Sequence, residues 1–217
     1  MEELNIMQRL AVWALPVLFA ITVHEVAHGW VANRFGDPTA KRLGRLTLNP
    51  IKHIDPIGTL LVPALLLMIG GFLFGWAKPV PVTWENLKHP KRDMAIVAAA
   101  GPLSNLVMAI VWAILLKVAV SLSGQFDWLA KPLAYMGIAG ISINIMLMVL
   151  NLLPLPPLDG GRVLSGLLPD RLAWSLNRIE PYGFFILLGL LATGVLTKIM
   201  MPFVNGMQAL LFSVMGL

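Results

Sequence analysis

The chain has 217 residues, of which 58% are hydrophobic and only 12% are charged, and its formal net charge is +5. An ordinary soluble domain has about 25% charged residues. A soluble chain of this length could not bury so many apolar side chains, because its ratio of surface to volume is too high. Composition therefore excludes a disordered tail, a secreted disulfide scaffold and a conventional soluble enzyme, and it indicates an integral membrane protein.

The chain contains no cysteine, so neither a disulfide nor a thiolate metal site can form. Any bound metal must therefore be held by His, Asp or Glu. The Lys and Arg residues lie in short loops between apolar runs, which is typical of the cytoplasmic loops of membrane proteins. We attribute the positive charge to membrane topology and expect no binding of nucleic acid.

Apolar runs follow one another along the chain and predict a polytopic membrane protein. They cover about residues 10–32, 57–76, 95–116, 133–153 and 182–201, and an apolar tail ends at residue 217. Each run should be helical, because backbone groups in lipid must bond within their own segment. The first run is too long for the core of a signal peptide. We predict an all-α helical bundle that forms a single membrane domain over residues 1–217.

Residues 77–84 differ from the apolar runs because Pro79 and Pro81 forbid a regular helix. The valines and the threonine of this segment suit the edge of a strand. We expect a strand or an extended ribbon here, and a plain linker fits the composition equally well.

The first apolar run contains the pattern His24-Glu25-x-x-His28. Residues four apart share one face of a helix, so both imidazoles can reach one metal ion, and Glu25 lies near enough to act on a metal-bound water. An ionisable residue at membrane depth costs a few kcal/mol, so it normally has a partner or a task. The alternative is a buried hydrogen-bond network between helices, which does not explain the spacing.

A catalytic zinc site usually has three protein ligands, so a third ligand is needed. His53 and His89 lie in basic loops, where we expect solvated histidines. Asp159 is the better candidate, because three prolines between Asn151 and Asp159 must unwind the end of the fourth run. Unwound backbone at that depth is tolerated where it lines a cavity or is buried in protein. Taken alone, Asp159 would be interpreted as a turn residue before two glycines.

Together these residues resemble the site-2 protease family, the zinc metalloproteases that cut peptide bonds within membranes. Three blocks carry the resemblance in the right order and spacing: residues 24–28, 100–105 and 151–161. The resemblance covers a catalytic core of about residues 10–165 and leaves C-terminal membrane helices at about 182–217. The chain is similar to the compact bacterial branch, which lacks PDZ and CBS domains.

The resemblance implies a role for each matching residue. One zinc ion per chain would have three ligands, His24, His28 and Asp159. Glu25 would be the general base, and Asn151 would help to hold the substrate carbonyl or oxyanion. Asn105 would serve in packing or in substrate support.

The implied activity is hydrolysis of peptide bonds within or near the transmembrane segments of membrane proteins, by a multi-pass protein of the bacterial cytoplasmic membrane. A helical substrate must first unwind, and the extended edge with Val80 and Val82 could hold it by strand addition. A catalytically inactive peptide-binding scaffold is one alternative, although it would not need Glu25. A transporter with a buried ion relay is another, but the inverted repeats expected of it are absent. The sequence leaves the oligomeric state open.

The proposed zinc site also makes a demand on topology. If the first four runs all crossed the membrane, the far ends of the first and the fourth would be separated by the ~30 Å hydrocarbon core. We therefore predict that the second run, residues 57–76, is re-entrant and does not cross. Its flanking loops are both basic, which predicts a zinc site toward the cytoplasm and an N-terminus outside.

Overall fold

The computed structural model describes residues 5–62, 65 and 77–217. This described part of the chain is helical and contains no β-strand. Among its helices, four are long and apolar enough to cross a membrane: α1 (Ile6–Arg34), α4 (Pro90–Leu122), α5 (Asp127–Asn151) and α9 (Val195–Met215). The predicted all-α polytopic membrane fold is confirmed.

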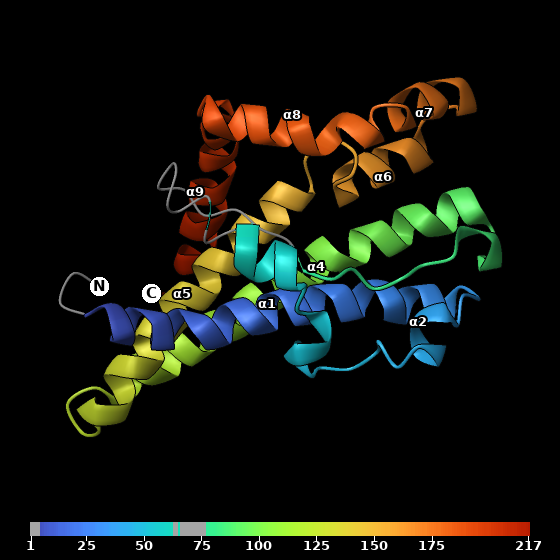
Figure 1. Ribbon diagram of the computed structural model, residues 1–217. Helices are drawn as coiled ribbons and strands as arrows, with labels where there is room; N and C mark the ends of the chain where they lie inside the picture. Colours follow the sequence, from blue (N-terminus) through green and yellow to red (C-terminus); the bar gives the residue numbers. More distant parts are fainter. Residues whose placement is uncertain (1–4, 63–64, 66–76) are drawn as a thin grey trace.

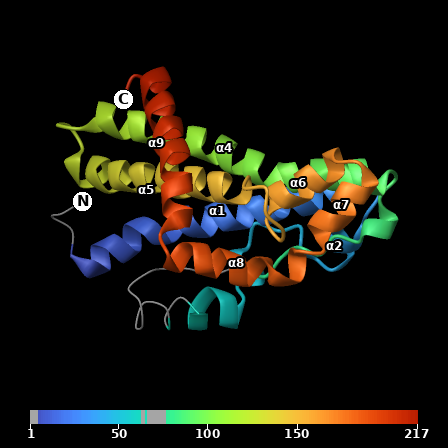
Figure 2. The same ribbon diagram turned by 90° about the horizontal axis from the view of Figure 1, so that it is seen from above.

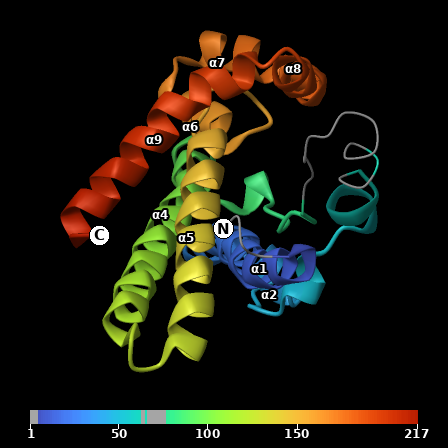
Figure 3. The same cartoon turned by 90° about the vertical axis from the view of Figure 1, so that its left-hand side faces the viewer.

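Helices α1, α4 and α5 form a three-helix core in which each helix contacts the other two (Figure 1). A short turn joins α4 to α5, and α4 runs antiparallel to α1 and α5 (Figure 2). The C-terminal ends of α1 and α5 consequently lie at the same end of the bundle. Helix α9 packs on α4 and α5, and α1 lies on the other side of these two helices (Figure 3).

The chain between α1 and α4 begins and ends at one end of the core. The backbone N–H of Lys88, just before α4, donates to the carbonyl of Phe35, just after α1, at 3.1 Å. The described short elements between them are α2 (Thr39–Arg42), η1 (Pro50–His53), η2 (Pro56–Leu61) and η3 (Trp84–Asn86). This return agrees with the predicted same-side topology, whereas most of the predicted re-entrant run lies outside the described residues.

Glycines set the distance between α4 and α5. A Cβ added at Gly137 would lie 2.8 Å from the Cβ of Leu116, and one added at Gly140 would collide with the indole ring of Trp112. Small residues of this kind let helix backbones approach closely, which is a main source of helix association within membranes. The polar side chains buried between these helices are therefore held in a tightly packed frame.

The prediction of a single helical run over residues 182–201 is wrong. The structure divides this region into α8 (Glu180–Ala192) and α9, with Gly194 between them at a φ of +72°. Glycine adopts this left-handed conformation readily, and it ends helices for that reason. The apolar tail is thus the C-terminal half of α9. Helix α8, with 13 residues, is only about 20 Å long and too short to cross the bilayer.

Helix α6 (Asp159–Leu167) is fixed against the first turns of α4, and α7 (Asp170–Asn177) follows it. A Cβ added at Gly166 of α6 would lie 2.5 Å from the Cβ of Ala95, so the two helices touch. The Lys91 ammonium donates to the carbonyl of Leu168 and to the carboxylate of Asp170, both at 2.6 Å. These contacts hold α6 in place, and α6 begins with Asp159.

The return of the chain between α1 and α4 can be tested by labelling, because a chain without native cysteine gives clean single-cysteine variants. Lys41→Cys and Glu85→Cys, both at exposed positions, should react with a membrane-impermeant maleimide from the same side of the membrane. Gly124→Cys, in the turn between α4 and α5, should react from the opposite side. Labelling of the first two positions from opposite sides would contradict this arrangement.

Candidate metal centre

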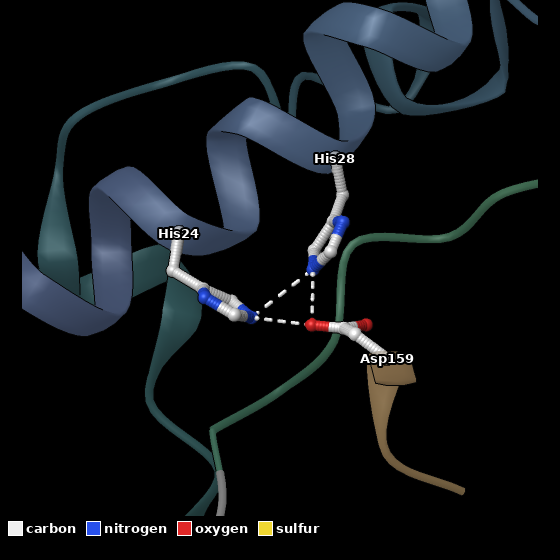
Figure 4. A group of neighbouring side chains, drawn as sticks. All are labelled: His24, His28 and Asp159. Carbon is white, nitrogen blue, oxygen red and sulfur yellow. Dashed lines mark hydrogen bonds and ion pairs between the residues drawn. The ribbon is translucent and has the colours of Figure 1, made fainter. Parts of the chain in front are cut away.

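Three predicted ligands meet at one point in the core, as Figure 4 shows. His24 and His28 project from the same face of α1, one turn apart, and Asp159 points toward them from the start of α6. Oδ2 of Asp159 lies 3.2 Å from Nε2 of His24 and 3.3 Å from Nε2 of His28. The two Nε2 atoms are 3.0 Å apart. The fold thus brings together residues that are distant in the sequence.

The protonation of the two imidazoles follows from their outer nitrogens. Nδ1 of His24 lies 2.7 Å from Oδ1 of Asn105, and Nδ1 of His28 lies 2.7 Å from the carbonyl oxygen of Val97. Carbonyl and amide oxygens only accept hydrogen bonds, so both Nδ1 atoms carry a proton. In the neutral form of each ring, Nε2 therefore presents its lone pair to the centre.

The centre has the geometry and chemistry of a zinc site. Two imidazole lone pairs face a carboxylate oxygen, and Oδ2 of Asp159 has no hydrogen-bond donor among the described residues. Three acceptors this close repel one another unless a metal ion or a proton lies between them. Tetrahedral ligands at 2.0–2.1 Å from zinc are about 3.3 Å apart, which matches the observed separations. The residues therefore fit a zinc ion with three protein ligands.

Gly101 of α4 closes one side of the centre, and the sequence did not single it out. A Cβ added there would lie 2.6 Å from Cε1 of His24 and would also collide with the ring of His28. Glycine inside a helix lowers its stability. The presence of Gly101 next to Pro102 within α4 could therefore have indicated that another group approaches the α4 backbone closely at this residue.

Glu25 is linked to the extended segment that follows the second apolar run. Its Oε2 atom accepts a hydrogen bond from the backbone N–H of Val80 at 2.7 Å. Val80 is buried, and Val82 is half-buried. The segment around them is extended, but no β-strand forms in the part of the chain described by the structure.

The two predicted asparagines lie in different surroundings. Asn151 is the last residue of α5, and its Nδ2 donates to the carbonyl of Leu147 at 3.0 Å. Asn105 is 0% exposed and lies behind His24, away from the centre. Its position fits the packing role that the resemblance left open.

The prediction of a solvated loop histidine is wrong for His53. This residue is 2% exposed, and its Nε2 lies 2.9 Å from the carbonyl oxygen of Thr47. The loop folds over it, which hydropathy alone does not reveal. His89 is exposed at the start of α4, as expected.

The turn before Asp159 depends on two glycines. A Cβ added at Gly160 would collide with the carbonyls of Leu152 and Leu153, and one added at Gly161 with the backbone around Pro156. The unwound end of α5 can therefore fold directly against the first turn of α6. Asp159 is both a residue of this turn and a member of the metal centre.

A buried His-His-Asp centre with an adjacent glutamate, inside a bundle of apolar helices, defines a membrane-embedded metallopeptidase. Comparison with known families agrees: residues 12–136 and 123–192 match the model of Peptidase family M50. The chain belongs to this family, that of the site-2 proteases. Membership favours a peptidase over the ion relay considered from the sequence.

Two relatives carry the name "Putative zinc metalloprotease". YwhC of Bacillus subtilis (strain 168) is 38% identical over 88% of this chain and 84% of its own length. Rip2 of Mycolicibacterium smegmatis is 34% identical over 83% of this chain and 66% of its own length. No solved structure matches the chain significantly.

Gly101→Ala should displace both imidazoles and weaken zinc binding by at least about tenfold, the effect usual for a misplaced ligand shell. Gly206→Ala is the matched control, because no atom of the described residues lies within 4 Å of a Cβ added there. Zinc affinity is measured by chelator competition on detergent-purified protein. Equal affinity of the two variants would show that Gly101 does not set the ligand positions.

Proposed function

We propose that His24, His28 and Asp159 hold the catalytic zinc of this intramembrane metallopeptidase and that Glu25 is its general base. The observation that carries the proposal is the convergence of three potential ligand atoms, from His24, His28 and Asp159, within 3.3 Å of one another. Substrates would be membrane-spanning proteins or peptides, because the site is enclosed by candidate membrane helices.

Bound zinc would supply a Lewis acid that polarises the scissile carbonyl and lowers the pKa of water toward neutrality. Glu25 then takes the proton of the attacking water and passes it to the leaving amine as the C–N bond breaks. The N–H of Val80 holds Oε2 of Glu25 at 2.7 Å. Oε1 has no hydrogen-bond partner among the described residues and is the atom that moves the proton.

Asn151 is the proposed donor to the oxyanion, at the end of α5 that leads to Asp159. Its Nδ2 donates to Leu147, and in this role it would exchange that carbonyl for the substrate oxygen. Such a donor is often worth about 3 kcal/mol in the transition state. For Asn105, complete burial supports an orienting role behind His24.

The extended segment of residues 78–83 is a suitable edge for an unwound substrate. Both of its ends are fixed, because the N–H of Lys78 donates to His53 at 2.9 Å and that of Thr83 to Asp37 at 2.7 Å. Among the described residues, the carbonyl of Val80 and the N–H and carbonyl of Val82 have no partner. Residues two apart share an edge, so these groups face the same side as Glu25.

Asp37 holds the far end of this segment as a charged group. Burial alone would raise its pKa, but hydrogen bonds from Thr39, Asn86 and Thr83 outweigh that effect and lower the pKa below its ordinary value. A carboxylate with several donors is a rigid anchor. It supports an edge that keeps its shape before a substrate arrives.

The cytoplasmic side of a bacterial cell membrane is the proposed location of the site. Lys41 and Arg42 follow α1, and Lys91 and Arg92 lie in the first turn of α4. These basic residues lie at the end of the core where α1 ends and α4 begins, and lysine and arginine favour the cytoplasmic side.

Glu25→Gln should abolish cleavage while zinc remains bound, because a general base contributes about 10²- to 10⁴-fold to the rate. Cleavage of synthetic transmembrane peptides in proteoliposomes is followed by mass spectrometry, and zinc per chain by elemental analysis. Glu85→Gln, at an exposed position, is the control. Undiminished cleavage by the Glu25 variant would refute its role as the base, and a zinc-free wild type would refute the site.

Val82→Pro should reduce cleavage about tenfold without loss of zinc, because proline removes one backbone donor worth about 0.5–1.5 kcal/mol. Val82→Ala keeps the N–H and should stay near the wild-type rate in the same peptide assay. If both variants lose activity equally, the side chain matters and strand addition at this residue is wrong.

A further inference from the structure

The structure assigns a positioning role to Asn144 of α5, whose hydrogen bonds go to Asn105 and Gly140 instead of to the proposed zinc ligands. We infer that Asn144 fixes the amide orientation of Asn105, and through it the tautomer in which His24 can bind a metal. The inference rests on the proposed role of His24 as a zinc ligand.

Asn144 is itself held in one orientation. It is 0% exposed, and its Nδ2 donates to the carbonyl of Gly140 on its own helix at 2.8 Å. The other end of its amide, Oδ1, therefore faces α4. There it accepts a hydrogen bond from Nδ2 of Asn105 at 3.0 Å.

The fixed amide of Asn105 in turn contacts two residues of α1, Ala20 and His24. Its Nδ2 has two hydrogens, and both have acceptors, Oδ1 of Asn144 at 3.0 Å and the carbonyl of Ala20 at 3.2 Å. Only its Oδ1 is left to face Nδ1 of His24, at 2.7 Å. The reversed amide would bring its oxygen against two other oxygens, which leaves buried acceptors unpaired.

The orientation of Asn105 decides which nitrogen of His24 is protonated. An oxygen opposite Nδ1 requires a proton there and leaves the lone pair on Nε2, which faces Asp159. An amide N–H opposite Nδ1 would favour the other tautomer, whose protonated Nε2 cannot bind a metal. A hydrogen-bond chain from Gly140 to His24 thus links all three core helices to one ring nitrogen.

Asn144 lies in a buried part of α5. Ile141 and Ile145 of the same helix are also fully or almost fully buried, as is Ala109 of α4. Among the described residues, Asn144 has hydrogen bonds only with Asn105 and Gly140, so this series of donors and acceptors has one favourable arrangement. Groups behind a metal-binding histidine fix its tautomer and its ring orientation.

Asn144→Leu should weaken zinc binding by about 10- to 100-fold, the usual effect of losing such a group. Asn144→Gln should lose less affinity, because its side-chain amide keeps both an acceptor for Asn105 and a donor for a backbone carbonyl. Ser142→Ala is the matched control, since Ser142 lies on the same helix but bonds to Gln208 of α9. Affinity is measured by chelator competition on the full chain.

Nitrogen-15 spectra of the protein with labelled histidines provide a second readout that does not depend on zinc affinity. The proton of the His24 ring should reside on Nδ1, and the Leu variant should lose that preference. A proton on Nε2 in the wild type, or equal zinc affinity of the Leu variant and the wild type, would overturn the role of Asn144. Absence of zinc from the wild type would instead refute the proposed zinc site, and the metal-free tautomer would still decide the role of Asn144.

Discussion

Three potential metal-ligand atoms from distant parts of the chain meet within 3.3 Å of one another in the interior of the bundle, and a metal ion or a shared proton makes this contact favourable. It requires the C-terminal ends of α1 and α5 to lie at the same end of the core. The hydrogen bond from Lys88 to Phe35 shows that the chain between α1 and α4 meets that requirement. The contacts of α6 with α4 then bring Asp159 to the histidines.

The ligand positions depend on small residues as much as on polar ones. Gly101 lets α4 approach the imidazoles, and Gly140 lets α5 approach α4. Close backbones bring a main-chain carbonyl to His28 and a pair of asparagines to His24. In an apolar bundle these polar groups have no water to compete for them, so each ring has one stable orientation. Close packing of the helices and the orientation of the metal ligands therefore depend on each other.

The sequence predicted those parts of the site that follow from local spacing. Two residues four apart in a helix share one face wherever the helix lies, so the pairing of His24 with His28 could be predicted from spacing alone. Asp159 could be predicted as a ligand only from the prolines before it together with the family resemblance. Asn144 is an amide in the middle of an apolar run, which was a signal of a buried partner, but only the packing of α5 on α4 identifies that partner. The break at Gly194 could not be predicted from hydropathy, because it depends on a backbone conformation.

In the proposed mechanism, the hydrogen bond between Glu25 and Val80 connects substrate binding to the chemistry. One segment holds the carboxylate through an N–H and presents its unpaired groups on the same side. A substrate can pair with that edge only as an extended chain, since a helix has already used its own N–H and carbonyl groups. Unwinding is thus a condition for reaching the base as well as for exposing the scissile bond. A folded transmembrane helix would be spared even when it lies beside the enzyme, because it offers no free backbone to the edge.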